Sequence, residues 1–272
     1  MHIVCNWRCL MRHAAWIACA VLVFPTIACA NTLYRSLNAI GIYGEAVGTP
    51  NSYHSFNTQG LANSFRTMKP ASGGNTSGGV GVYLSGMSQD DFFMHLGFNY
   101  GFSPIIGNSN GNASSSGHSM AFNARLGKGF QFGPDLLIGP YIGYQYARFQ
   151  IGVGNNGAFG TATYNNNALG GGLFMAMAPA QDLTLTAHAG YLVGLSANER
   201  VKFGAFSLQP GGTPDADVFQ AGAKLSYRFL PDLSGFVGVN YDHYMASGHA
   251  GPVTERTRVN VLRGLAGVAY NF

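Results

Sequence analysis

The chain has 272 residues, of which 10% are charged, 13% are aromatic and 39 are glycine. A soluble domain usually carries about 25% charged residues, whereas a sheet that faces lipid keeps charges off its outer side. The formal net charge of +4 is too small to imply a nucleic-acid partner. Composition therefore favours a β-sheet protein of the membrane, with a soluble β-sandwich as the competing fold class.

The first thirty residues have the organisation of a secretory signal peptide. Arg8 and Arg12 precede an apolar run over residues 14–24, and Ala28-Cys29-Ala30 forms an Ala-x-Ala cleavage pattern. We predict a signal peptide over residues 1–30, cleaved near Ala30, and one domain over residues 31–272. Met11 could equally be the start of translation, because the segment that follows it is already a complete signal.

All four cysteines lie within this segment, at Cys5, Cys9, Cys19 and Cys29. The mature chain is therefore expected to lack disulfides, a thiolate nucleophile and Cys-ligated metal. Its formal charge falls from +4 to +2, because two arginines leave with the signal. The mature sequence has no apolar run long enough for a transmembrane helix.

Ten segments alternate apolar residues with small or polar ones at a period of two, which is the pattern of a β-strand and not of a helix. In the clearest segment, Phe219, Leu225 and Phe229 share one face while Lys224 and Arg228 lie on the other. The predicted strands cover residues 39–47, 79–87, 91–101, 118–127, 136–150, 161–177, 183–195, 219–229, 236–242 and 259–272.

The connections between these strands alternate in length. Four are short, at residues 88–90, 128–134, 178–182 and 230–232, and five are long, at residues 48–77, 102–116, 151–160, 196–216 and 246–255. A soluble sandwich has no reason to sort its loops in this way, whereas a membrane barrel has tight turns on one side and long loops on the other. We predict an all-β, transmembrane, antiparallel up-and-down β-barrel of about 10 strands, with 8 to 12 possible, closed because hydrocarbon leaves no partner for a free sheet edge.

The last strand ends on Phe272 and carries Tyr270, Val268 and Leu262 on the same face. This pattern resembles the closing strand of bacterial outer-membrane β-barrels. The resemblance implies localisation in the outer membrane, contact with its lipid and lipopolysaccharide, and recognition of Tyr270 and Phe272 by the barrel-assembly machinery.

The segment from Leu137 to Tyr146, in which glycine and tyrosine recur, resembles the translocator barrels of autotransporters. Those barrels usually have twelve strands and a preceding passenger domain. Here eight residues separate the expected mature start at Asn31 from the first predicted strand, so we do not expect this chain to export a passenger of its own.

The face opposite the apolar one would line the lumen, and it carries the residues that could support chemistry. They are Glu45, His95, Arg125, Tyr141, His188, Lys224, Arg228, Asp242 and Arg263. One interpretation is a cationic pore lining that favours anions. The other is a lumen filled by ion pairs and hydrogen bonds, which we favour because a ring of about ten strands lies near the narrow end of the barrel range.

Enzymatic interpretations find little support in the sequence. Ten-stranded barrels include the omptin proteases, which use Asp pairs and an Asp-His pair, but Asp242-His243 are neighbours on opposite faces and Asp90-Asp91 lie in a short turn. His118-Ser119, considered for a lipid A deacylase, have the same defect. His95 and His188 have no third metal ligand nearby in the pattern. We predict no cofactor and no metal.

The favoured function is a non-enzymatic outer-membrane barrel whose long loops, especially residues 48–77 and 196–216, bind an extracellular surface ligand as an adhesin does, or which has a structural role in the envelope. The alternatives are a narrow, weakly anion-preferring, porin-like pore, a membrane-embedded hydrolase and an autotransporter-type translocator.

Overall fold

The computed structural model describes residues 32–48, 53–58, 71–72, 76–102, 118–155, 158–203, 206–208, 215–250 and 253–272. The predicted signal peptide lies outside these ranges, as do most of the predicted loop 48–77 and nearly all of the loop 102–116.

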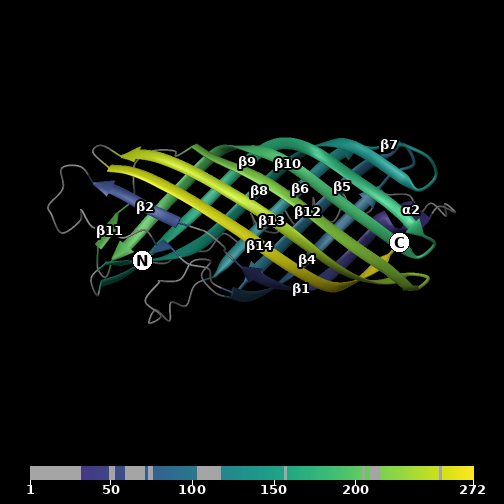
Figure 1. The fold of residues 1–272 in the computed structure, drawn as a ribbon, viewed down its shortest axis with the longest axis horizontal. Coiled ribbons are helices and arrows are strands. Elements are labelled where there is room, and N and C mark those ends of the chain that lie inside the picture. The colour runs from purple at the N-terminus through teal and green to yellow at the C-terminus, as the bar shows by residue number, and fades with distance from the viewer. Residues whose placement is uncertain are drawn as a thin grey trace, which may run out of the picture.

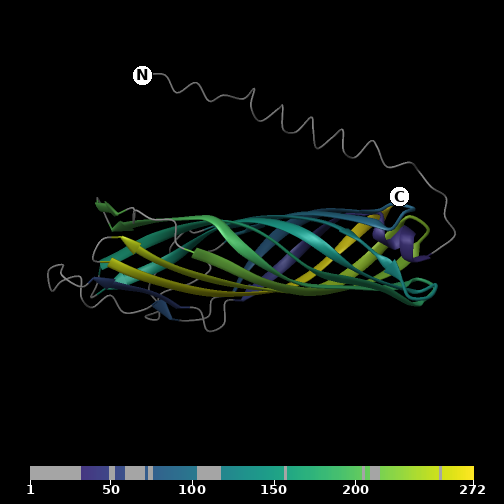
Figure 2. The same ribbon diagram turned by 90° about the horizontal axis from the view of Figure 1, so that it is seen from above.

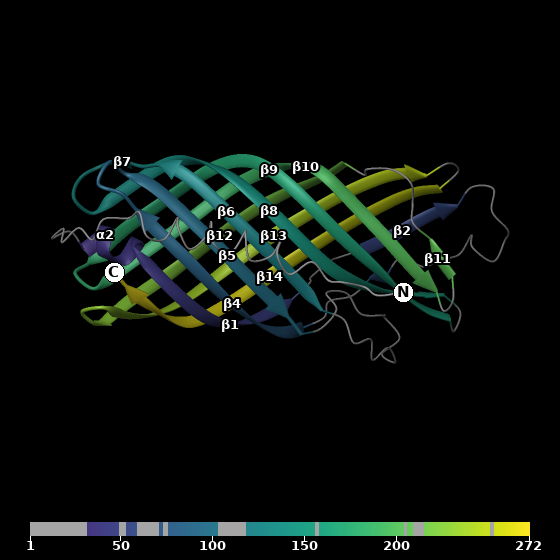
Figure 3. The same ribbon diagram turned by 180° about the vertical axis from the view of Figure 1, so that it is seen from behind.

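Ten long strands form one antiparallel sheet that closes on itself (Figures 1 and 3). Each pairs with the next along the chain, and the last pairs with the first over ten positions, from Ala39 opposite Asn271 to Gly48 opposite Leu262. The prediction of a ten-stranded antiparallel barrel is confirmed. The strands are β1 (Ala39–Gly48), β4 (Thr76–Met87), β5 (Phe92–Gly101), β6 (Ser119–Lys128), β8 (Leu136–Asn155), β9 (Ala158–Ala180), β10 (Leu183–Phe203), β12 (Asp215–Leu230), β13 (Leu233–Ala250) and β14 (Val253–Asn271).

Side-chain exposure alternates along the strands as the sequence pattern predicts. On β1, Ile42 is 60% exposed to the outside whereas Glu45 is 7% exposed inside the ring. This polarity, with apolar residues outside and polar ones inside, is the reverse of a soluble protein and suits a wall that lipid surrounds.

Exposed aromatic side chains lie near two levels of the outer surface. Phe92, Phe130 and Tyr270 lie near the short turns, whereas Tyr100 and Phe219 lie toward the other end of their strands, with Tyr191 directly opposite Phe219. Aromatic girdles mark the two interfaces of a membrane barrel, so these levels indicate where the lipid begins and ends.

The short turns gather at one end of the barrel, which also holds the C-terminus (Figures 1 and 2). All four lie where the sequence predicts them. Two backbone hydrogen bonds fix the chain end there, since the Phe272 N–H donates to the Asn38 carbonyl at 3.0 Å and the Asn271 N–H donates to the Asp232 carbonyl at 2.8 Å. Tight turns are periplasmic in outer-membrane barrels, so we assign this end to the periplasm.

A short helix that the sequence analysis did not predict, α2 (Thr32–Leu37), lies at this periplasmic end (Figure 2). Its Leu33 and Leu37 are almost completely buried. Within the described ranges, no helix is long and apolar enough to cross a membrane.

The opposite end departs from the prediction, because three expected loops are largely strand. The β8–β9 pairing runs up to Asn155 opposite Ala158, and the β13–β14 pairing up to Ala250 opposite Val253. The expected loops 151–160 and 246–255 were therefore wrong, and the loop 196–216 was wrong where β10 continues to Phe203. These segments lie beyond the outer aromatics, where neither face must meet lipid, so the period that marks a strand is lost.

Three shorter segments extend the sheet at this outer end, and a fourth lies at the periplasmic end. β2 (Tyr53–Thr58) pairs with β14 beyond the end of β1, from Thr58 opposite Val253 to Tyr53 opposite Arg258, and β3 (Ala71–Ser72) pairs with β2. β11 (Phe206–Leu208) pairs with β10, and β7 (Phe130–Gln131) pairs with β8 beside the short turns. Part of the predicted loop 48–77 is thus a strand that continues the seam between β14 and β1.

Inside the ring, glycine on one strand often lies beneath a large side chain of its neighbour. A Cβ atom on Gly267 would overlap the carbonyl oxygen of Ile42 and would lie 2.7 Å from both Phe236 Cζ and Tyr43 Cβ. Gly264 on the same strand points to lipid, and a Cβ there would meet nothing within 4 Å.

This contrast predicts opposite outcomes for the same substitution on β14. Gly267→Ala should lower the free energy of unfolding by about 1–3 kcal/mol, because the seam must widen to admit the methyl group. Gly264→Ala should leave it unchanged or raise it by up to about 1 kcal/mol. Guanidinium unfolding of the refolded protein in detergent measures both, and equal midpoints for the two variants would contradict the packing described here.

Candidate functional site in the barrel lumen

The periplasmic mouth of the lumen is filled by α2. Leu33 and Leu37 pack against a group of apolar wall residues made up of Met87, Leu137, Tyr141, Phe174, Ala176 and Ala178. Asn38, just after the helix, fixes its orientation, because its Oδ1 accepts from the Met87 N–H at 2.7 Å and its amide donates to the Met87 carbonyl at 3.2 Å. The Tyr34 hydroxyl donates to Asp91 in the β4–β5 turn.

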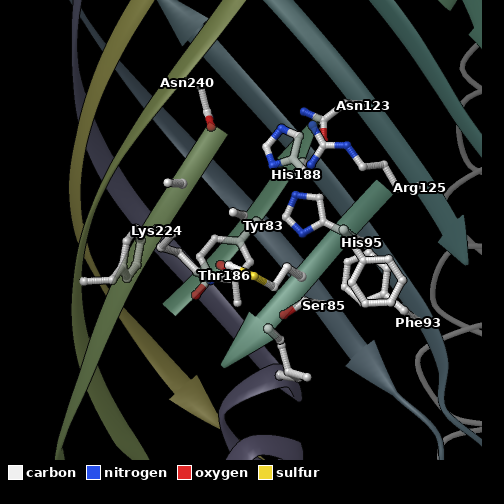
Figure 4. A pocket seen from close by; sticks show the side chains of 18 of the residues that line it. Tyr83, Ser85, Phe93, His95, Asn123, Arg125, Thr186, His188, Lys224 and Asn240 are labelled. Carbon is white, nitrogen blue, oxygen red and sulfur yellow. The ribbon is translucent and has the colours of Figure 1, made fainter. Parts of the chain in front are cut away.

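Next to Leu37 lies a cavity of about 110 Å³ (Figure 4). Its polar wall comes from four strands, which contribute His95 on β5, Asn123 and Arg125 on β6, His188 on β10 and Lys224 on β12. The register brings these residues together, because His95 is directly opposite Arg125 and Lys224 is directly opposite Thr186. Tyr83, Phe93 and Phe236 supply aromatic surface to the same cavity.

A buried ion-pair network lies farther from the periplasm. Arg263 on β14 donates to Asp242 on β13, and its Nε lies 3.9 Å from Glu45 Oε2 on β1. The Asn99 amide also donates to both Glu45 oxygens, at 3.3 and 3.4 Å. One guanidinium therefore holds two carboxylates and ties the last strands to the first.

A layer of apolar side chains lies toward the outer end of the lumen. Phe149, Tyr164 and Tyr244 form its centre, with ring centroids 4.7 Å apart for Phe149–Tyr164 and 5.4 Å apart for Phe149–Tyr244. Leu192, Val218, Val259 and Val261 complete it, and all four are fully buried. Gln145 links this layer to the polar one by donating to the Tyr244 hydroxyl at 2.9 Å.

The structure places all nine residues that the sequence analysis assigned to the lumen on the inner face. It brings Glu45, Asp242 and Arg263 into one network, and it brings His95, Arg125, His188 and Lys224 to one cavity. Tyr141 packs beside α2, with its ring centroid 5.7 Å from the Arg125 guanidinium. Arg228 lies apart from both groups, paired with Asp182 at 2.8 Å beside the periplasmic turns.

Three features of the lumen were not foreseen. The outer apolar layer comes from inward residues such as Leu192 and Val218, whose positions in the alternating pattern were a usable signal. The aromatic wall of Tyr83 and Phe236 was equally visible as inward positions. The helix α2 gave no such signal, because six residues are too few to show a helical period.

The residue pairs considered for hydrolysis do not form a site. Asp242 is buried in the lumen on Arg263, whereas His243 lies on the opposite face, where its Nδ1 is 2.5 Å from Asn260 Oδ1. Asp90 and Asp91 lie in the β4–β5 turn. Across the described ranges, no group of three or more His, Cys, Asp or Glu side chains is placed to hold a metal ion.

Comparison with known protein families shows to which family the chain belongs. The model of the autotransporter β-domain matches residues 53–240, which is more than half of the sequence. The chain belongs to the autotransporter β-domain family. The predicted resemblance to autotransporter barrels is thereby confirmed, and membership of this β-domain family places the protein in the bacterial outer membrane.

Solved structures of outer-membrane barrels are similar to this β-domain. The outer membrane protease OmpT from Escherichia coli aligns with a TM-score of 0.52 and 10% identity, covering 86% of this chain and 95% of OmpT. The translocator domain of the autotransporter NalP from Neisseria meningitidis aligns with a TM-score of 0.41 and 11% identity, covering 97% of this chain and 98% of that domain. At such identities the OmpT likeness shows the fold alone. No curated protein matches the sequence.

The ion-pair network yields a direct prediction about stability. Arg263→Met leaves Asp242 and Glu45 buried without their shared cation, so the free energy of unfolding should fall by about 3–5 kcal/mol. Arg35→Met is the matched control, because Arg35 pairs with Asp232 at 3.6 Å and both side chains are about half exposed; its cost should be within about 1 kcal/mol. Guanidinium unfolding followed by circular dichroism gives both values. A loss at Arg263 no larger than that at Arg35 would show that the network does not hold the barrel together.

Proposed function

We propose that this β-domain is a non-enzymatic surface protein, in which a closed barrel carries a rigid strand wall that binds a partner outside the cell. The observation that carries the proposal is the unequal length of the strands. β1, β4, β5 and β6 have 10 to 12 residues each, whereas β8, β9 and β10 have 20, 23 and 21. A transmembrane strand needs about 9–11 residues, so the longer strands have about twice the length that lipid requires.

The excess length lies on the outer side, because the short turns fix the periplasmic ends. We define the outer wall as two groups of paired strand segments. Residues 149–155, 158–164 and 199–203 continue above the last β6 partner of β8. Residues 215–217, 245–250 and 253–258 continue above Val218, the last β12 residue that pairs with β10. Figure 1 shows these strands extending past the ends of β1 and β4. At about 3.3 Å per residue and a tilt of about 45°, the β8–β9 tip projects roughly 15–20 Å beyond the low rim.

A paired ladder above the membrane is suited to binding. Loops carry binding best where a rigid scaffold holds them, and the ladder raises the β8–β9 and β13–β14 connections away from the lipopolysaccharide surface on one side only. Because β1, β4, β5 and β6 end below the outer wall, we expect a partner to contact the wall laterally as well as at its tip.

The packing of the lumen supports a binding role over transport. α2 fills the periplasmic mouth and the apolar layer around Phe149 and Tyr164 fills the outer half. A translocating or conducting barrel would need both to move. The separation of Asp242 from His243 on opposite faces also supports a role without hydrolysis, although OmpT, which shares the fold, is a protease.

Removal of the wall tests the proposal. Replacing residues 151–162 by Asn-Gly joins Gln150 to Thr163, which are already opposite each other, through a two-residue hairpin turn. The variant and the unmodified protein are each produced in a bacterial strain that does not otherwise adhere. Cells with the variant should adhere to cultured epithelial cells, and aggregate with one another, at least tenfold less than cells with the unmodified protein. The band that shifts on heating in detergent should persist, because the membrane part of the barrel is untouched.

The matched control shortens the low side of the rim, by replacing residues 103–117 between β5 and β6 with Asn-Gly. This variant should adhere as the unmodified protein does. If the wall variant adheres equally well, or if the unmodified protein confers no adhesion, the surface-binding proposal fails and a structural role in the envelope takes its place.

A further inference from the structure

The lumen cavity beside α2 has an unusual balance of charge. Arg125 and Lys224 both line it, and no Asp or Glu is among its lining residues. Lys224 Nζ lies over two aromatic rings, 4.1 Å from the centroid of Tyr83 and 5.4 Å from that of Phe236. Within the part of the chain that the structure describes, it makes no ion pair and no hydrogen bond. Its positive charge therefore interacts only with the faces of these aromatic rings.

Arg125 is only partly satisfied. Its Nη2 donates to Gln220 Oε1 at 2.9 Å, but its Nε is buried and has no hydrogen-bond partner among the residues that the structure describes. The buried lumen carboxylates Asp242 and Glu45 are already held by Arg263. Three buried cations thus share two carboxylates in this part of the barrel.

Side chains with N–H donors surround the two cations. His95 is directly opposite Arg125 in the sheet and lines the same cavity as Arg125 and Lys224. His188 reaches the same region from β10, and Figure 4 shows it together with Asn123 and Arg125 on one side of His95. Neither imidazole has a hydrogen bond to any described residue, so each has an N–H that can donate into the cavity.

The backbone makes room for these side chains. A Cβ atom on Gly222 would overlap the side chains of Asn240 and His188, and one on Gly97 would lie 2.8 Å from the Asn123 amide nitrogen. Glycine at these two inward positions lets the polar groups lie flat over the neighbouring strand. The donors therefore surround a space of about 110 Å³, which suits about three waters or one tetrahedral anion.

We propose that this cavity binds one small oxyanion, of the size of phosphate or sulfate, between Arg125 and Lys224. A buried cation without a counter-charge is costly, and an oxyanion would supply charge to both cations and acceptors to the imidazole and amide N–H groups. The cavity lies on the periplasmic side of the apolar layer around Phe149, and α2 covers it there through Leu37, so an anion would exchange past α2.

Calorimetric titration of the refolded full-length barrel tests this proposal, with sodium phosphate, sodium sulfate and sodium chloride as separate titrants at constant ionic strength. Phosphate or sulfate should bind saturably with one site per barrel, and chloride should not. Lys224→Met should weaken the binding at least tenfold. Arg228→Met is the matched control, because Arg228 also faces inward but is paired with Asp182 away from the cavity, and it should bind as the unmodified protein does.

A second measurement separates lost binding from lost folding. Addition of the oxyanion should raise the guanidinium midpoint of the unmodified protein and of Arg228→Met, but not that of Lys224→Met. In buffer free of oxyanions, Lys224→Met should unfold at the same or a higher midpoint, because a buried charge has been removed. Absence of saturable binding by both oxyanions, or equal binding by Lys224→Met, would overturn the proposal.

Discussion

The pairing of β1 with β14 closes the sheet into a ring. In hydrocarbon every backbone N–H and C=O must be satisfied within the sheet, so ten strands become a membrane protein only when the last meets the first. β1 provides ten residues for this seam, from Ala39 to Gly48, and β2 continues it along β14 outside the lipid. The buried ion-pair network also crosses this seam, because Glu45 of β1 pairs with Arg263 of β14.

A closed ring of ten strands is narrow, and this constrains what lies inside it. Several large inward side chains pack over glycine on the neighbouring strand, as Tyr43 and Phe236 do over Gly267. The lumen is consequently a packed interior. From the periplasmic end outward it contains α2, the cationic cavity, the Arg263 network and the apolar layer. The membrane-spanning part is therefore occupied by packing except at the cavity beside α2, and for this reason our proposal assigns binding of a large partner to the outer wall.

Much of this could be predicted from the sequence. The predictions were right where the membrane constrains both faces of a strand and wrong where it does not. β12 was readable because lipid on one face and a polar lumen on the other impose a period of two on residues such as Phe219 and Lys224. The same constraint ends above the membrane, so the tops of β8, β9 and β10 read as loops although they are strands. The inward position of Arg263 was predictable, but its two partners depend on register across β13, β14 and β1, which no single segment encodes. The six residues of α2 are recognisable only from the apolar mouth that they fill.

A closed barrel that is filled along its axis should not conduct ions, and planar-bilayer recording of the refolded protein measures this. The protein should be inserted in the form that shifts on heating, so that an intact ring is known to be present. A lumen filled by α2, the Arg263 network and the layer around Phe149 predicts no stepwise ion current at moderate voltage. Reproducible, uniform conductance steps that prefer anions would contradict this account and would establish a pore lined by Arg125, Lys224 and Arg263.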